Sequence, residues 1–220
     1  TETIEPQAPT ITDPMTTLAS KEPDFFIAMV AGTPCTQAVT EAAQNGMKEN
    51  VEYLFQPLTC TGVSFVSKEK VGGDGSASNG WWIAGGGNLD FNAEAQGDNP
   101  WIAFGRQLLA DEGLDYKASS SFGLGFNYGW PFWQSVQIAS QLEGGLSRTN
   151  LILAMRSIEM TNPNLIDGIA FNMNGAMDAY PIEGSEFAQY DSTKQGWIQV
   201  GDIVELSGKS SNCAWDQSIG

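Results

Sequence analysis

Near the N-terminus, the spacing of apolar positions predicts a strand, a helix and a second strand. Apolar residues run almost without interruption from Asp24 to Ala31, which is typical of a strand buried on both faces of a parallel sheet. Thr33 and Pro34 then suit an N-cap and a first helical residue, and Gly46 suits a left-handed C-terminal cap. Residues 51–55 return as a strand. We expect a right-handed βαβ unit whose parallel strands end at one edge.

The same criteria divide the rest of the chain into short elements. Gly85, Gly86 and Gly87 follow a predicted strand, and such a cluster can absorb the change of direction where a chain crosses between lobes. We expect helices over 13–19, 100–112 (with Asn99 as cap), 127–142 and from Thr149 or Asn150 to 158, and strands beginning within 1–11 and over 81–84, 168–173, 187–190, 197–200 and 203–206. The helix over 127–142 is rich in aromatic residues, and we expect it to be largely buried.

The amino-acid composition excludes several classes of function but says little about the fold. The formal net charge of -16 and the absence of histidine argue against a nucleic-acid partner, because no basic stripe is available to contact phosphates. No imidazole can activate a serine or cysteine nucleophile, no phosphate-binding loop motif occurs, and we expect no cofactor. The sequence contains no run of about eighteen apolar residues, the length needed to cross a membrane as a helix. The acidic, lysine-poor composition fits an exported protein.

The chain has three cysteines, and two of them can form a disulfide if the compartment is oxidising. Cys35 and Cys60 each lie at or just beyond the end of a predicted neighbouring strand, so we expect a disulfide between them. Cys213 is then left for a partner elsewhere. Three buried, reduced thiols are the alternative. Zinc is a poorer interpretation, because neither a C-x-x-C pair nor a histidine is present to supply its ligands.

The order of the segments PDFFIAMVAG, NGWWIAGG, NYGWPFWQSVQIASQ and DGIAFNMNGAMDAYPIEGSEFAQYD resembles the later part of type I solute-binding proteins of ABC transporters, the branched-chain amino-acid receptor class. The resemblance implies an α/β fold with parallel-sheet, Rossmann-like lobes joined by three crossings. Residues 1–88 would form the second lobe, 89–167 a helical return to the first lobe, and 168–220 the strands that complete the second lobe and the hinge. The N-terminal start of the first lobe has no counterpart.

The resemblance also implies a non-enzymatic receptor that closes on a small ligand by hinge bending. Its partners would be the ligand, an ABC transporter permease and the missing N-terminal lobe or a second chain. Its location would be extracytoplasmic, in the periplasm or on the cell surface as a lipoprotein. The helix over 127–142 is apolar on more than one face, so we expect another polypeptide or a neighbouring copy to cover it, with Cys213 as a candidate tether.

Ligands of open α/β sheets bind outside the carboxyl ends of the strands, which makes this edge the candidate site. The candidate ligand contacts at this edge are Thr33, Thr59, Trp81 and Trp82, and the resemblance implies Tyr128 and Trp130 as further, aromatic contacts on the hinge side. Five of them have a structural alternative: Thr33 can be only a cap, one of the two adjacent tryptophans must face the core, and Tyr128 and Trp130 can be core aromatics. The region of Leu58 and Thr59 lacks the carboxylate with which amino-acid receptors hold an ammonium group, which counts against an amino-acid ligand.

Two further interpretations stay open. Asp90, Glu94 and Asp98 alternate with asparagines as in a calcium loop, but the central glycine and closing glutamate are missing, so we expect no metal. The seven tryptophans are also compatible with a secreted carbohydrate-active enzyme or a carbohydrate-binding module.

Overall fold

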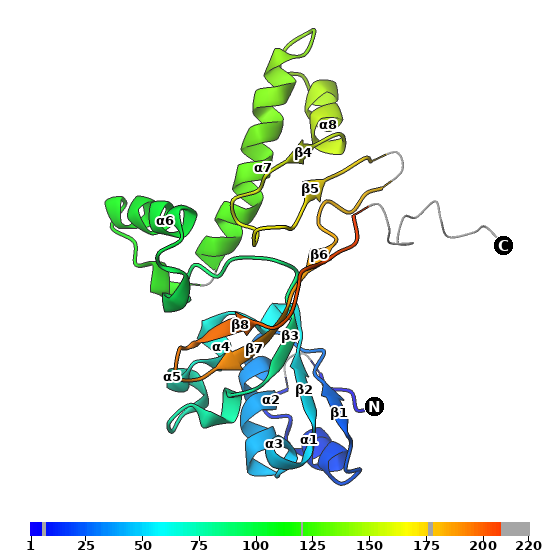
Figure 1. The fold of residues 1–220 in the computed structure, drawn as a ribbon, viewed down its shortest axis with the longest axis vertical. Helices are drawn as coiled ribbons and strands as arrows, with labels where there is room; N and C mark the ends of the chain where they lie inside the picture. Colours follow the sequence, from blue (N-terminus) through cyan, green and yellow to red (C-terminus); the bar gives the residue numbers. More distant parts are fainter. Residues whose placement is uncertain (6–7, 120, 176–177, 208–220) are drawn as a thin grey trace, which may run out of the picture.

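The computed structural model describes residues 1–5, 8–119, 121–175 and 178–207. They form two parts joined by three chain segments, as Figure 1 shows. We call them the sheet lobe and the helical part. The sheet lobe contains α1 (Thr12–Ala19), β1 (Phe25–Ile27), α2 (Thr33–Gln44), α3 (Met47–Asn50), β2 (Tyr53–Gln56), η1 (Leu58–Cys60), α4 (Val63–Val66), α5 (Lys68–Val71), η2 (Ser76–Ser78), β3 (Trp82–Ala84), β7 (Phe187–Asp191) and β8 (Gly196–Gln199).

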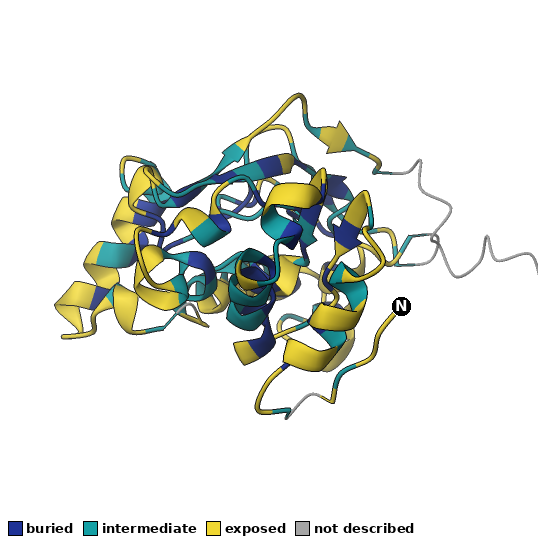
Figure 2. Cartoon of the chain, turned by 90° about the horizontal axis from the view of Figure 1, so that it is seen from below, coloured by how far each residue is buried: buried dark blue, intermediate teal, exposed yellow. Residues whose placement is uncertain are grey.

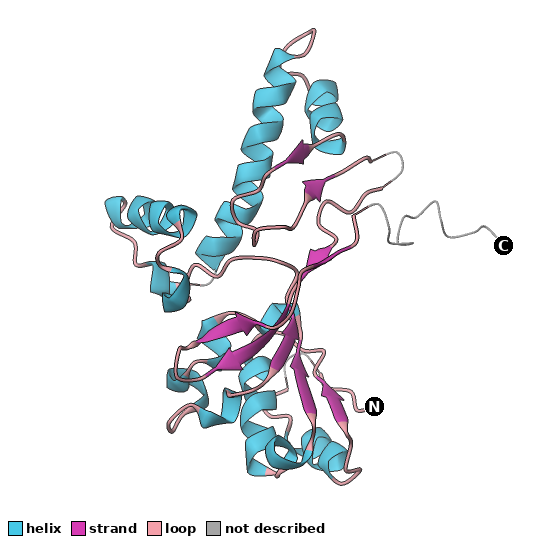
Figure 3. Ribbon diagram, viewed as in Figure 1, coloured by secondary structure: helices cyan, strands magenta, loops and turns pink. Residues whose placement is uncertain are grey.

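The sheet of this lobe has the strand order β1-β2-β3-β7-β8, which can be followed in Figure 3. β1, β2 and β3 are parallel, and β7 and β8 are antiparallel to their neighbours. This confirms the mixed α/β class and the βαβ unit. The first strand is shorter than expected, because the chain leaves the sheet after Ile27 and turns at Gly32, whose φ is 67°.

The core of the sheet lobe lies between one face of the sheet and the helices. Side chains of α1 and α2 pack against Phe26, Leu54 and Trp81 in one cluster. The expectation that β1 is buried on both faces is wrong: Phe26 is buried, whereas its neighbours Phe25 and Ile27 are exposed. The reason is that, among the described residues, no helix covers the second face. Figure 2 shows the buried positions on the inner sides of the helices and the exposed positions on their outer sides.

The helical part contains the longest helix of the chain. Its elements are η3 (Glu94–Gln96), α6 (Pro100–Asp111), η4 (Tyr116–Ala118), α7 (Ser121–Gln141), α8 (Arg148–Arg156), β4 (Glu159–Met160), β5 (Phe171–Asn172), β6 (Gly184–Ser185) and β9 (Val204–Glu205). β4 pairs with β5, and β6 pairs with β9. None of the helices in the described ranges is both long enough and apolar enough to cross a bilayer.

α7 begins at Ser121, six residues before the expected start, and it is not largely buried. Only Ser135 and Ala139 are buried, while Tyr128 is 70% and Trp133 53% exposed. The expectation of burial is wrong within this chain, because α7 packs mainly on α8, meets Trp101 of α6 through Phe126 and Trp130, and leaves many of its other side chains exposed.

The predicted helix starts have mixed outcomes. Asn99 caps α6 as expected, because its side chain accepts hydrogen bonds from the amides of Trp101 and Ile102. α8 is capped by Ser147, not by Thr149 or Asn150. The Asn150 amide group donates instead to the carbonyls of the preceding turn. The strand expected within 1–11 is also absent from the described part of that range.

Candidate functional site

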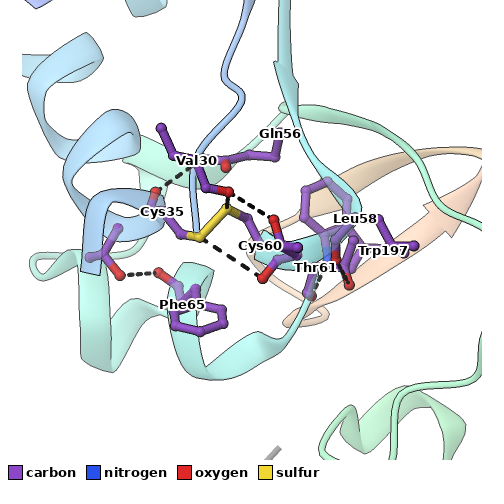
Figure 4. The surroundings of a disulfide bond; sticks show 10 residues. Val30, Cys35, Gln56, Leu58, Cys60, Thr61, Phe65 and Trp197 are labelled. Carbon is purple, nitrogen blue, oxygen red and sulfur yellow. Dashed lines mark hydrogen bonds between the residues drawn. A yellow bond between two sulfur atoms is a disulfide. The ribbon is translucent and has the colours of Figure 1, made fainter. Parts of the chain in front are cut away.

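The carboxyl ends of β1 and β2 are joined by the disulfide between Cys35 and Cys60, which confirms the predicted pair (Figure 4). Cys35 lies in the first turn of α2 and Cys60 ends η1, and both are fully buried. Their Cα atoms are 5.3 Å apart. The bond therefore fixes the loop after β1 against the loop after β2. Cys213 lies outside the described residues.

Thr33 and Thr59 are brought to this edge and are both exposed. The Thr59 hydroxyl donates a hydrogen bond of 2.7 Å to the carbonyl of Val30. Thr33 does not cap α2, so that expectation is wrong: Gly32 is the N-cap, no side chain caps this end, and Thr33 is the first helical residue. The edge thus carries two hydroxyl groups beside Leu58, which is about half exposed.

Gly85, Gly86 and Gly87 lead from β3 away from the sheet, along one of the three segments that join the two parts (Figure 1). A Cβ atom on Gly85 would lie 1.9 Å from Glu186 Oε1, and a Cβ on Gly87 would lie 2.1 Å from Ile169 Cδ1. A Cβ on Gly86 would lie 2.9 Å from Leu58 Cδ2, so this crossing also contacts the candidate edge. Gly86 and Gly87 have φ values of 80° and 74°, which other residues rarely adopt, and a side chain on Gly85 would collide with the buried Glu186, so all three positions favour glycine.

Glu186, which the sequence interpretation missed, lies at the centre of the crossing. Its side chain is buried, and its Oε2 accepts a hydrogen bond of 2.8 Å from the amide of Gly87. Its carbonyl accepts from the amide of Gly85, and the carbonyl of Phe187 accepts from the amide of Val200. The three segments are therefore hydrogen-bonded to one another. Burial raises the pKa of the Glu186 carboxyl above its ordinary value.

Trp81 and Trp82 lie at the start of β3, away from its carboxyl end. Trp81 is fully buried and packs edge-on against Phe26 in the core. Trp82 lies on the opposite face, where its ring stacks on Phe55 at 6.2 Å. As expected of adjacent strand positions, only one of the two faces the core. The Trp82 ring lies over the middle of the sheet, and no described contact joins it to Thr33 or Thr59.

Tyr128 and Trp130 lie on α7 in the helical part. Trp130 packs against Trp101 of α6 at 5.1 Å, whereas Tyr128 is exposed. Trp101 is held in turn by Asn164, whose Oδ1 accepts from the indole nitrogen at 2.7 Å. The buried Asn164 also donates to the carbonyl of Phe126. This asparagine, which the sequence interpretation also missed, ties α6 to the start of α7.

The acidic stretch after the crossing does not converge on one point. Asp90 accepts hydrogen bonds from the amides of Asn92 and Val63, and burial raises the pKa of its carboxyl. Glu94 pairs with Lys117, which lowers the pKa of the glutamate. Within the described ranges, no three acidic, histidine or cysteine side chains gather as metal ligands would.

Comparison with solved structures identifies the fold. The chain matches the fatty acid ABC transporter substrate-binding protein of Thermomonospora curvata with a TM-score of 0.64 and 15% identity, over 91% of this chain and 48% of that one. It matches the solute-binding protein of an ABC transporter from R. palustris in complex with 4-hydroxybenzoate with a TM-score of 0.62 and 11% identity, over 93% and 51%. A further R. palustris solute-binding protein, in complex with benzoate, matches with a TM-score of 0.58 and 16% identity, over 88% and 47%.

The chain therefore has the fold of solute-binding proteins of ABC transporters, and it spans about half the length of those it matches. One other structural match is an extracellular ligand-binding receptor. No family model and no curated protein matches the sequence.

Proposed function

We propose that this chain is part of a non-enzymatic, extracytoplasmic solute receptor that delivers a small ligand to an ABC transporter permease. In this proposal the sheet lobe and the helical part belong to two lobes, and the three crossing segments form the hinge on which the receptor closes. The single observation that carries the proposal is the edge bearing Thr33 and Thr59, fixed by a disulfide and contacted by the glycine crossing. The fold shared with solute-binding proteins supports it.

The chemistry of the edge favours a ligand without an ammonium group. Thr33, Leu58 and Thr59 offer hydroxyls and an apolar contact but no carboxylate. Glu186 is buried and bonded to Gly87, so its charge is not presented at the surface. An ammonium group removed from water would lack a compensating anion. Small organic acids with an apolar body are therefore the first class to test, in keeping with the fatty acid and benzoate proteins matched above.

The test is ligand-induced thermal stabilisation of the receptor that contains this chain. Benzoate, 4-hydroxybenzoate and a fatty acid are compared with leucine, a short peptide and an oligosaccharide. A ligand at a hundred times its Kd adds about 2.7 kcal/mol to the free energy of unfolding. Replacing a hydroxyl that bonds a charged ligand weakens binding by roughly tenfold or more, so we expect Thr33→Val and Thr59→Val to lose affinity.

Thr17→Val is the matched control, because Thr17 is exposed on α1 and its hydroxyl bonds only its own helix at the carbonyl of Asp13. Its affinity should equal that of the unmodified protein. Stabilisation by none of the compounds at millimolar concentration would contradict the proposal, and stabilisation by the oligosaccharide alone would favour the carbohydrate-binding alternative.

A further inference from the structure

The amides of Gly85, Gly86 and Gly87, which we call the glycine triad, all donate hydrogen bonds to the same two residues. The Gly85 amide donates to the Glu186 carbonyl at 2.9 Å, and the Gly87 amide donates to Glu186 Oε2 at 2.8 Å. Between them, the Gly86 amide donates to Ser185 Oγ at 3.3 Å. The triad follows β3, whereas Ser185 and Glu186 lead into β7. Two of the three crossing segments are therefore joined at three consecutive residues.

The side chain of Glu186 is enclosed where it meets the triad. Glu186 is 5% exposed, and Gly85 and Gly87 are buried. A buried amide needs a hydrogen-bond acceptor, and the Gly87 amide obtains its acceptor from this carboxyl. Without the side chain of Glu186, the Gly87 amide would be left buried without this partner.

The carboxyl of Glu186 has no basic partner within the described ranges. The ion pairs there join Lys117 to Glu94 and Lys194 to Asp191. Burying a carboxyl group costs free energy that an apolar side chain of similar size would not. The contribution of Glu186 is therefore to bond and fill the space at the triad, and not to neutralise a cation.

The third crossing segment is attached at the same point. The Phe187 carbonyl, next to Glu186 in the chain, accepts a hydrogen bond of 2.8 Å from the Val200 amide. β6, which ends one residue before Glu186, pairs with β9. Figure 1 shows the three segments converging between the two parts. Movement of Glu186 relative to the triad would therefore displace all three crossing segments.

Rotation about the dihedral angles of the triad would break the bond to Glu186. Hinge residues absorb large changes of φ and ψ, and glycine has the widest range of both. The Gly87 amide reaches Glu186 Oε2 only in a narrow range of these angles, because a hydrogen bond weakens steeply with distance and misalignment. The bond thus favours one setting of the triad over the others.

We propose that Glu186 is a positioning residue of the hinge, whose side chain holds the glycine triad in one setting and so fixes the orientation of the sheet lobe relative to the helical part. This inference rests on the proposed function, in which the crossing segments form the hinge. The role requires an oxygen acceptor at the Gly87 amide and a side chain long enough to bring it there from position 186. It does not require a charge.

Pulsed electron paramagnetic resonance on the receptor that contains this chain tests the proposal. Spin labels are attached at Gln44, at the exposed end of α2, and at Thr149, at the exposed start of α8. Both positions are replaced by a ketone-bearing amino acid, which takes the label and leaves the cysteines untouched. The width of the distance distribution between the labels reports how freely the two parts move relative to each other.

We expect Glu186→Ala and Glu186→Asp to broaden this distribution about twofold or more, because neither side chain reaches the Gly87 amide and the hinge angles can then vary. Glu186→Gln should match the unmodified receptor, because it has the same length and keeps an oxygen acceptor. Glu41→Ala is the matched control and should also match it. Glu41 accepts a hydrogen bond of 2.6 Å as well, but from Thr12 Oγ1 within the sheet lobe.

Any other order of the widths would overturn the proposal, including no change in Glu186→Asp or a Glu186→Gln distribution as broad as that of Glu186→Ala. Amide exchange of β2 shows whether each variant is folded. If Glu186→Ala alone loses this protection, the comparison of Glu186→Asp with Glu186→Gln decides. Loss of protection in both Glu186→Ala and Glu186→Asp would overturn the proposal too, because Glu186 would then act in folding.

The distance measurement needs no ligand, so its outcome is separate from that of the proposed function. A receptor that shows the expected order of widths but is stabilised by none of the compounds would refute the proposed function and leave the role of Glu186 standing. A receptor that binds a solute but has equal widths in all variants would do the reverse.

Discussion

Large apolar side chains are buried on the helix-covered side of the sheet lobe but exposed to solvent on the outer sides of α7. Trp81 is fully buried in a cluster built from α1, α2 and the sheet, whereas Trp133 of α7 is 53% exposed. Burial of apolar surface stabilises a fold by roughly 25 cal/mol per Å². The sheet lobe therefore obtains stability from its own residues, while the exposed apolar side chains of α7, such as Trp133, contribute little. The helical part has a smaller cluster of buried apolar residues, formed by Ile158, Leu165 and Phe171, and Phe91 and Ile102 are buried separately near α6.

Matched tryptophan substitutions give the largest difference between the two regions. We expect Trp81→Ala to lower the free energy of unfolding of the sheet lobe by about 3–5 kcal/mol, because it leaves a cavity in a packed core. Trp133→Ala should change it by less than about 0.5 kcal/mol, as surface substitutions usually do. Urea unfolding followed by far-UV circular dichroism measures both. Equal losses would show that α7 is packed within this chain.

The disulfide should stabilise the sheet lobe alone. Cys35 and Cys60 are separated by 25 residues, and closing a loop of that length is worth about 3 kcal/mol through the unfolded state. We expect the Cys35→Ala/Cys60→Ala double variant to lose about that much in urea unfolding. Adding a reductant should destabilise the unmodified protein similarly and leave the double variant unchanged. If a reductant also destabilised the double variant, the effect of the reductant could not be assigned to the bond between Cys35 and Cys60.

The smallest expected effect is on the pH dependence of stability, through the buried carboxyl of Glu186 in the crossing. Burial raises its folded-state pKa above the ordinary value of 4.5, so the folded protein binds the proton more tightly than the unfolded chain. Stability should then fall as pH rises from about 4.5 through the raised value. Glu186→Gln should flatten this part of the profile, because the variant carries no carboxyl to titrate. Thermal unfolding at several pH values measures it. An unchanged slope in the variant would show that other groups are responsible.

Features that depend on residues close together in the sequence were predicted correctly. The βαβ unit, the disulfide and the Asn99 cap depend on neighbouring residues and on one strand pairing, and all three are confirmed. The Thr33 cap was predicted wrongly because α2 begins one residue earlier than expected, after Gly32, without a side-chain cap. The α8 cap was predicted wrongly because Ser147, two residues before Thr149 and three before Asn150, accepts the hydrogen bond at the helix start.

Features that depend on distant segments were not predictable in this way. Burial of β1 on both faces and burial of α7 were inferred from apolar content, but burial depends on what packs against an element. Glu186 acts on Gly87, 99 residues earlier, and no local pattern links them. The available signal was an acidic residue directly before strand β7, together with a glycine cluster in the segment after β3. The six candidate ligand contacts stay a prediction.

The central claim is that the sheet lobe is stabilised by residues of this chain, whereas α7 is not. Amide hydrogen exchange of residues 1–220 tests this claim most directly. The backbone amides of β2 and of the buried turns of α2 should exchange only through global unfolding of the sheet lobe. The amides of α7 around Phe132 and Trp133 should exchange at least about a hundredfold faster, because local opening of this helix exposes little additional apolar surface. Equal protection of α7 and β2 would contradict the account, since it would mean that the chain stabilises both regions by itself.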